Sequence, residues 1–266
     1  MKTADAGTVT AALSSIQGIR NKEEEAAYQA GLERLRNPHL LDLWKGFVEA
    51  GLSTAQGNAE TSTVNLAMNA TRTSPRDKIT TYFTSLYSTN GTTGQLITTA
   101  NAMRGGIKYD VNVDDRLFGF GFTDLEFDEF QDLDLRFVPG GGLGYHAINT
   151  ERATLDFSMG GSLNREFFST GLNRTSGELL FGDELTFQLS KATGLRQKFV
   201  FYPNLTETGA YRMNFDISGI TALSRWLSWQ ISLGDRYLSN PVPGRKKNDV
   251  LFTTGIRVTF AKEGVR

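Results

Sequence analysis

The sequence predicts an all-β protein: a closed antiparallel up-and-down transmembrane β-barrel of about 12 strands, preceded by a short N-terminal helix. Apolar residues alternate with small or polar ones from 250 to 260, the pattern of a strand between two different solvents. Turn residues separate about twelve such runs along the chain. No apolar stretch approaches the roughly 18 residues of a spanning helix. A mean hydropathy of -0.30 fits a barrel, because lumen-facing residues dilute the lipid-facing ones.

Composition limits the other possibilities. The 266 residues include no cysteine, which excludes a disulfide scaffold and a thiolate metal site and is compatible with an oxidising envelope compartment. A net charge of -1 does not indicate nucleic acid as a partner, because nucleic-acid binding relies on an excess of basic residues. We therefore expect no nucleic-acid binding.

The N-terminal segment, residues 1–41, is expected to lie in the periplasm. Residues 1–7 lack the apolar core of a signal peptide, so either this start is a mature or truncated form or the export hypothesis is wrong. Asn21 and Glu24 form a capping box that begins a helix over 21–37, and Pro38 ends it. Its narrow apolar stripe allows docking but not a core position, and a periplasmic surface helix is favoured over a plug in the lumen.

From Leu43 onward the strand period dominates, and the barrel is expected over residues 42–260 with a tail at 261–266. The expected strands are about 43–53, 61–72, 78–88, 96–109, 115–125, 132–147, 153–164, 178–190, 195–203, 210–221, 225–238 and 249–260. An even number of strands brings both ends of a barrel to one side.

Loop lengths distinguish this pattern from a soluble sandwich. Counted from a periplasmic N-terminus, the connections on one side are brief, whereas most on the other are longer, as outer-membrane barrels require. Trp229 and Tyr237 share one face of the eleventh run and lie near opposite rims, as aromatic girdles predict.

The last strand resembles the signal that the barrel-insertion machinery reads. Its residues are Gly255, Val258 and Phe260, in the order Thr253-x-Gly255-x-x-Val258-x-Phe260. We therefore expect that machinery to be a partner during biogenesis.

Four local motifs carry a family resemblance. They are Leu43-Trp44-Lys45-Gly46 with Gly57-Asn58, Gly140 to His146, Gly182-Asp183-Glu184-Leu185, and Lys246-Lys247-Asn248-Asp249-Val250. Together they resemble the bacterial family of YdiY-like salt-induced outer-membrane proteins over about residues 42 to 260. The resemblance implies an outer-membrane barrel of a Gram-negative bacterium, and brings no catalytic residue, substrate or cofactor.

An outward apolar and aromatic face would send a set of polar side chains into the lumen. The expected lumen-lining residues are Lys45, Glu49, Arg104, Lys108, Asp134, Arg136, His146, Asp156, Glu184, Arg196, Lys198, Arg212, Asp216, Arg236 and Arg257. Most of the charges are basic, which would give a pore a mild preference for anions. Alternatively, both signs interlock as salt bridges that fill a narrow barrel.

His146 is the one imidazole base expected within the barrel. A membrane hydrolase could combine it with Ser158 or Ser162 as nucleophile and Asp156 as orienting group, if the strand register brought them together. An ordinary hydrogen-bonding role is the favoured interpretation, and we expect no catalytic residue and no enzyme activity.

Three other features have simpler interpretations. The glycines at 140–144 lack the following helix of a phosphate-binding loop, so they more often serve curvature or close approach. The acidic residues at 110–115 and 124–132 lack an ordered cation motif, and we expect no metal site and no cofactor. Arg245, Lys246 and Lys247 could contact the phosphates of lipid or lipopolysaccharide.

These observations leave three hypotheses. The first is passive passage of solutes or ions, or envelope adaptation to ionic stress, the latter from the resemblance alone. The second is a structural barrel with a filled lumen, whose helix at 21–37 binds a periplasmic protein. The third is the His146-dependent hydrolase.

Overall fold

The structure is a computed structural model, and it describes residues 2–3, 7–8, 20–36, 42–55, 61–91 and 95–261. The chain divides into two compact units. One comprises residues 1–42 and 263–266, and the other comprises residues 43–262. Of the expected tail, Ala261 belongs to the last strand and the rest lies outside the described residues.

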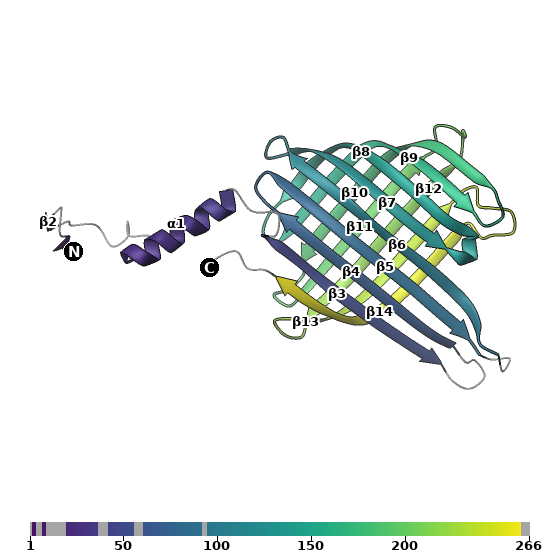
Figure 1. The fold of residues 1–266 in the computed structure, drawn as a ribbon, viewed down its shortest axis with the longest axis horizontal. Helices are drawn as coiled ribbons and strands as arrows, with labels where there is room; N and C mark the ends of the chain where they lie inside the picture. The colour runs from purple at the N-terminus through teal and green to yellow at the C-terminus, as the bar shows by residue number, and fades with distance from the viewer. Residues whose placement is uncertain are drawn as a thin grey trace. The chain divides into compact units, whose positions relative to one another are not determined.

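The first unit contains a two-residue hairpin, β1 (Lys2–Thr3) with β2 (Gly7–Thr8), and the helix α1 (Lys22–Arg36) (Figure 1). The expected helix and its capping box are confirmed. The Glu24 amide donates to Asn21 Oδ1 at 2.8 Å, and the Asn21 amide donates to Glu24 Oε2 at 2.9 Å. The expected stop at Pro38 lies outside the described residues. Among the described helices, none is long and apolar enough to cross a membrane.

The second unit is a closed barrel of twelve antiparallel strands, as the sequence predicts. The strands are β3 (Trp44–Ala55), β4 (Thr61–Thr73), β5 (Asp77–Asn90), β6 (Ile97–Asn112), β7 (Leu117–Asp128), β8 (Leu133–Asn149), β9 (Ala153–Phe168), β10 (Asn173–Gln188), β11 (Thr193–Pro203), β12 (Tyr211–Ala222), β13 (Leu227–Leu238) and β14 (Asn248–Ala261). Each strand pairs with its sequence neighbour, and β14 pairs with β3 to close the wall. This closing seam pairs Lys45 to Ala50 of β3 with Ala261 to Ile256 of β14.

The two ends of the barrel differ in the length of the connections between strands. The turn end carries the connections 74–76, 113–116, 150–152, 189–192 and 223–226, and the loop end carries 56–60, 91–96, 129–132, 169–172, 204–210 and 239–247. At the turn end, Asp114 Oδ1 accepts the amides of Arg116 and Leu117, both at 2.7 Å. These two hydrogen bonds, Arg116 first, hold the pKa of Asp114 below its usual range because they favour the charged carboxylate.

Two boundaries differ from the expected ones at the loop end. β9 extends to Phe168 and β10 begins at Asn173, instead of the expected 164 and 178, because the two strands continue their register pairing toward the loop end. The expected loop at 126–131 instead contains the 3-10 helix η2 (Glu129–Gln131). Asp128 caps η2 by accepting the amides of Phe130 and Gln131, a short-range device that no strand period reveals.

Alternation along the strands separates an outer from an inner face. On β6, for example, Met103, Ile107 and Tyr109 are exposed, whereas Asp110 is buried. Because the wall is closed, the face that carries the buried polar side chains is the inner one. The inner face is therefore polar in much of its area and the outer face apolar.

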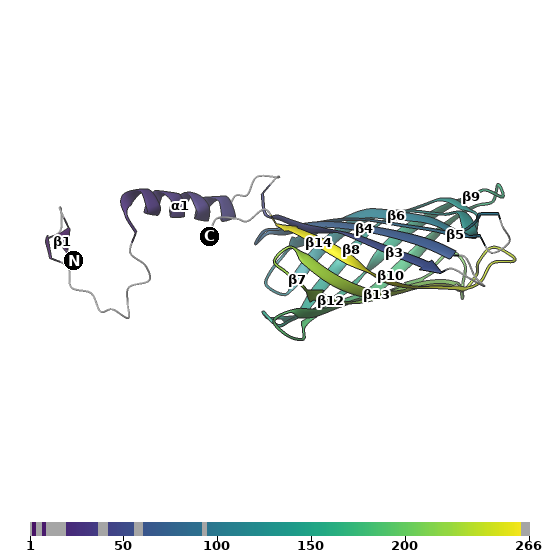
Figure 2. The same cartoon turned by 90° about the horizontal axis from the view of Figure 1, so that it is seen from below.

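The barrel is narrower in Figure 2 than in Figure 1, so its cross-section is flattened.

Glycines permit close strand approach at two seams of the wall. At β8 and β9 the register pairs Gly142 with Gly160, and a Cβ on Gly142 would meet the Gly160 Cα at 2.6 Å. At β14 and β3, a Cβ on Gly255 would meet the carbonyl oxygen of Ala50 at 2.7 Å. A larger residue at either position would therefore contact the backbone of the neighbouring strand.

The candidate functional site in the barrel lumen

Ion pairs cover much of the inner face, and three of them, together with one histidine–aspartate contact, join residues that the sequence assigned to the lumen. Each of these four links neighbouring strands. His146 Nδ1 lies 2.7 Å from Asp156 Oδ1, and the ion pairs are Arg196 with Glu184 at 2.6 Å, Arg236 with Asp216 at 2.7 Å and Arg257 with Glu49 at 3.3 Å. The last pair lies on the seam where β14 meets β3.

Four other expected basic residues pair with acids that the sequence reasoning missed. They are Arg104 with Asp124, Lys108 with Asp110, Arg136 with both Glu126 and Glu166, and Arg212 with Glu178. These acids were assigned to loops or lay at the margins of the expected strands. The signal that could have found them is charge balance, because a basic excess inside a barrel needs acidic partners on the same face. Their presence removes the basis for the expected anion preference.

Three expected residues have no ion pair within the described chain: Lys45, Asp134 and Lys198. Lys45 and Lys198 are exposed, and the Lys198 backbone pairs with Glu184 and Asp216 across the sheet. Asp134 is exposed where the β8–β9 register shifts between Leu133 and Leu135. That irregularity interrupts the strict alternation from which its position was inferred.

The expectation that aromatic side chains all face outward is wrong for β7. Phe118 and Phe120 are buried with Leu180, Val200 and Tyr202 in one cluster on the inner face, and Phe122 packs against it. The rings lie over glycines of β8, where a Cβ on Gly140 would meet the Phe122 ring at 2.6 Å. Close approach of bulky groups is thus confirmed as one purpose of the glycine run at 140–144.

Charged side chains on the inner face of β10 to β13 differ in exposure. Side-chain exposure is 40% for Arg196, 25% for Glu184, 32% for Arg236 and 48% for Asp216. By contrast, the Arg212 and Glu178 side chains on these same strands are 7% and 3% exposed. Solvent therefore reaches the first four charged groups, and we call these four residues, with the exposed Lys198 of β11, the hydrated wall.

Of the alternative hydrolase site, the structure brings together His146 and Asp156 but joins neither serine to the imidazole. His146 Nδ1 lies 2.7 Å from Asp156 Oδ1, and the imidazole stacks on Phe118. Ser158 Oγ donates to the Gly182 carbonyl at 3.4 Å, and Ser162 Oγ donates to Glu178 at 3.3 Å. Among the described residues neither hydroxyl is hydrogen-bonded to His146.

Contacts cross the mouth at the loop end. Arg245 donates from Nε and Nη2 to Asp132 Oδ2, at 2.9 and 2.6 Å. Gln131 Nε2 donates to Asp249 Oδ2 at 3.0 Å. These residues belong to the β7–β8 and β13–β14 connections or their margins, which lie on opposite sides of the barrel in strand order. We call these two contacts the mouth bridge.

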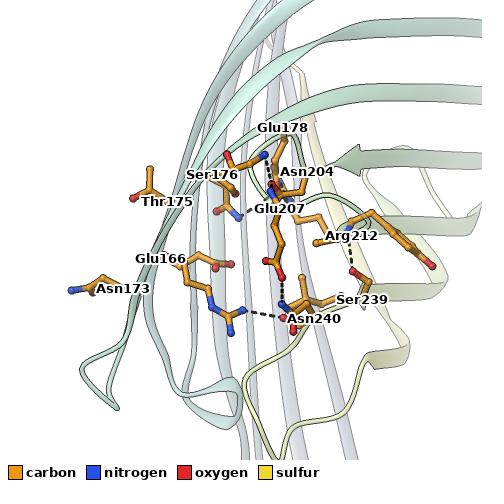
Figure 3. A pocket seen from close by; sticks show the side chains of 16 residues that line it. Glu166, Asn173, Thr175, Ser176, Glu178, Asn204, Glu207, Arg212, Ser239 and Asn240 are labelled. Carbon is orange, nitrogen blue, oxygen red and sulfur yellow. Dashed lines mark hydrogen bonds and ion pairs between the residues drawn. The ribbon is translucent and has the colours of Figure 1, made fainter.

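Beside the mouth bridge is a cavity of about 470 Å³, shown in Figure 3. Its lining comes from the loop-end portions of β9, β10, β12 and β13 and from the connections after β11 and β13. The residues are Asn164, Glu166, Asn173, Arg174, Thr175, Ser176, Glu178, Asn204, Thr206, Glu207, Ala210, Tyr211, Arg212, Leu238, Ser239 and Asn240. Of these, the sequence reasoning named only Arg212, because most of the others belong to loops and strand margins that carry no periodic signal.

The residues of the expected insertion signal lie on the last strand. Val258 and Phe260 are exposed on the outer face of β14, and Gly255 packs against Ala50 of β3. Within the described residues, no group of three or more histidines, aspartates or glutamates could hold a metal ion.

Comparison with known proteins gives one family match. A family model described as "Protein of unknown function, DUF481" matches residues 48–260. A search of curated proteins found no match.

Similar solved structures include a NanC porin, the translocator domain of the autotransporter NalP from Neisseria meningitidis and a KdgM porin. The NanC porin is 11% identical with a TM-score of 0.44, over 81% of this chain and 97% of that one. The NalP domain is 13% identical with a TM-score of 0.39, over 90% and 98%. The KdgM porin is 6% identical with a TM-score of 0.41, over 82% and 99%.

Proposed function

Because the chain belongs to the DUF481 family of proteins of unknown function, we propose its role from the geometry of its own barrel. The proposal is a barrel in the outer membrane of a Gram-negative bacterium that allows passive passage of small polar solutes or ions. The resemblance to salt-induced proteins extends the proposal to adaptation of the envelope to ionic stress.

The outer face supports the membrane location. Exposed apolar side chains follow the outer face of the strands, as on β14, where Phe252 is 64% exposed. Near the loop end Phe201, Tyr211 and Tyr237 form a row of aromatic contacts, with centroids 5.6 and 5.5 Å apart. Trp229 is exposed toward the turn end. Such an apolar band between aromatic rows suits lipid, so we propose lipids and lipopolysaccharide as its surroundings.

The hydrated wall of the lumen is the observation that carries the proposal of passage. Charged side chains that line a closed barrel and remain a quarter to a half exposed, such as Arg196 and Asp216, face water inside it. Their pairing neutralises the lining, so we propose little preference between anions and cations.

The aromatic cluster and the buried Arg212–Glu178 pair favour a second candidate, a filled barrel. In that case α1 would supply the function by docking to a periplasmic protein. Tyr28 on α1 is 41% exposed, with the Arg20 guanidinium 3.6 Å above its ring. Chemical cross-linking of the chain to periplasmic proteins tests this candidate. A cross-linked partner that is lost when residues 20–36 are deleted would support it.

We also propose that the barrel is not an enzyme. The hydrogen bonds of Ser158 and Ser162 to groups other than His146 support this. An esterase assay of the purified protein and of His146→Ala tests it, and activity that disappears in the variant would contradict it. A further proposal is that Gly255, Val258 and Phe260 engage the insertion machinery, which Phe260→Ala would weaken in an assembly assay.

Planar bilayer recording tests passage. Heat-modifiable migration on SDS gels first establishes the folded barrel, and a small steady conductance is then expected. The double variant Arg196→Glu with Lys198→Glu should shift the reversal potential toward cations, because both residues line the hydrated wall. Lys191→Glu, in a turn-end connection, is the matched control and should shift it little. No conductance from a folded barrel would favour the filled-barrel candidate.

A further inference from the structure

The cavity at the loop end opens among polar groups from four strands, β9, β10, β12 and β13, and from the connections after β11 and β13. Its volume of about 470 Å³ falls within the range of small-molecule sites, roughly 300–1,000 Å³. Figure 3 shows side chains from several elements around it, including Glu178 and Arg212 and, from other elements, Glu207 and Asn240. The site is therefore large enough for a ligand of one or two rings.

Charged groups on its wall already have partners. Arg212 donates Nε to Glu178 Oε1 at 2.9 Å and Nη2 to Oε2 at 2.7 Å. Glu166 accepts from Arg136, and Arg174 Nη1 donates to the Asn240 carbonyl at 2.9 Å. Glu207 Oε1 accepts from the Asn240 side-chain amide at 2.7 Å. An ionic ligand at Arg212 or Glu178 would have to displace a partner, and leaving a buried charge unpaired is expensive. Arg174 and Glu207 are both bonded to Asn240 and carry opposite charges, so an ion attracted to one of them would be repelled by the other.

Several uncharged groups keep hydrogen-bonding capacity. Thr206 Oγ1 accepts the Gly177 amide at 2.9 Å, and Ser239 Oγ accepts the Tyr211 amide at 2.8 Å, so each hydroxyl proton is left to donate. Asn204 Oδ1 accepts two backbone amides, which leaves its side-chain NH₂ as a donor. The Ser176 side chain has no hydrogen bond to another described residue. The lining thus offers hydrogen-bond donors and acceptors together, and its charged groups are of both signs.

We propose that this cavity binds a neutral polyhydroxylated solute, of the mono- or disaccharide class. A sugar hydroxyl donates one hydrogen bond and accepts others, which matches a wall of amides and hydroxyls. A neutral ligand leaves the Arg212–Glu178 ion pair in the lining intact. The site rests on the barrel geometry and deepens the proposed function by naming the class of solute that meets the mouth.

Equilibrium dialysis with radiolabelled maltose tests the proposal. The protein is held in a detergent without a sugar head group, and glucuronate and glucosamine serve as the charged comparison probes. Saturable maltose binding at one site per barrel, weaker for both charged probes, is the expected result. Tighter binding of either charged probe, or no saturable maltose binding, overturns the proposal.

Ser176→Phe should fill the cavity and weaken maltose binding at least tenfold. Thr123→Phe adds the same bulk on the outer face of β7 and should leave binding unchanged. Heat modifiability verifies that each variant is folded. Should Ser176→Phe fail to fold, Asn204→Ala, which removes an amide beside the cavity in Figure 3, replaces it, with Asn101→Ala as control, an amide that bonds Glu129 away from the cavity. Equal binding by cavity and control variants overturns the site.

Dialysis does not depend on conduction, so the two proposals can fail separately. Saturable binding without conductance would refute the proposal of passage and support the binding site. Conductance without saturable binding would refute the binding site and support passage.

Discussion

Arg212 and Glu178 form the most enclosed ion pair on the inner face, with side-chain exposures of 7% and 3%. The guanidinium also lies 3.6 Å from the Tyr202 ring centroid, which adds a cation–π contact. Three hydrogen bonds join the pair, so each charge depends on the other for its solvation. Removing one partner therefore differs from removing both.

Arg212→Ala should lower the free energy of unfolding by about 3–5 kcal/mol, because Glu178 would remain buried without a counter-charge. Urea titration in lipid vesicles, followed by tryptophan fluorescence, measures the loss. The double variant Arg212→Met with Glu178→Leu should recover most of it, since apolar groups of similar size need no partner. Equal losses in the single and double variants would contradict this account.

Asp183 and Glu184 are adjacent in sequence and lie on opposite faces of β10. Glu184 pairs with Arg196 inside, whereas Asp183 pairs in register with Phe157 and Phe199 of the apolar outer face. A carboxylate toward lipid is unfavourable, though less so than a basic group. Asp183→Leu should thus stabilise the barrel in vesicles by about 1 kcal/mol. Glu184→Leu, the matched control, should not stabilise it, and a gain equal to that of Asp183→Leu would contradict the assignment of faces.

Individual positions on the inner face are predictable from sequence only where alternation is regular. For Arg196 and Arg236, alternation along a regular strand was enough to predict the inner face. The position of Glu126 required the true end of β7, which extends to Asp128, beyond the expected end at residue 125. Asp124 shares the face of Phe118 and Phe120, which was expected to point outward. Inward Phe118 and Phe120 required knowledge of their glycine neighbours on β8, because the side chains alone favour lipid.

At the scale of elements, alternation and turn residues predict all twelve strands, and Asn21 with Glu24 predicts α1. Boundaries fail where side-chain capping or cross-strand pairing decides them, as at η2 and at the start of β10. The loop-end cavity could not be predicted, because it arises from connections whose relative positions depend on barrel closure.

The glycine seam between β8 and β9 should be sensitive to the smallest addition. A Cβ on Gly142 would contact the Met159 carbonyl oxygen and the Gly160 Cα, which are backbone atoms of the partner strand. Gly142→Ala should lower the free energy of unfolding by about 1–3 kcal/mol through overpacking. A Cβ on Gly219 of β12 would meet nothing within 4 Å, so Gly219→Ala should have little effect. Urea titration compares the two, and equal effects would exclude the seam as the cause.

At the scale of the whole barrel, the mouth bridge couples opposite sides of the loop end. The Asp132 and Arg245 side chains are 27% and 37% exposed, so their ion pair is worth up to about 1 kcal/mol. Under the proposed passage, Arg245→Ala should shift the balance between closed and open mouths by up to about fivefold and raise mean bilayer conductance.

Two comparisons control the experiment on the mouth. Arg225→Ala removes a positive charge from a turn-end connection and should leave conductance unchanged. Exchanging the charges, Asp132→Arg with Arg245→Asp, should restore the original conductance because the pair can form again. Raised conductance in the exchanged variant would mean that the bridge does not restrain the mouth.

The pairing of β14 with β3 sets the timing of assembly. Arg257 and Glu49, which join across that seam, are 208 residues apart in sequence. Contacts of such separation form late, because the loop they close carries a large entropic cost. An open, curled sheet with two bare edges should therefore precede the barrel, and it cannot close until the last strand arrives. That strand also carries Gly255, Val258 and Phe260, so a chain truncated before β14 would lose both its closing strand and the signal expected to recruit help for closing.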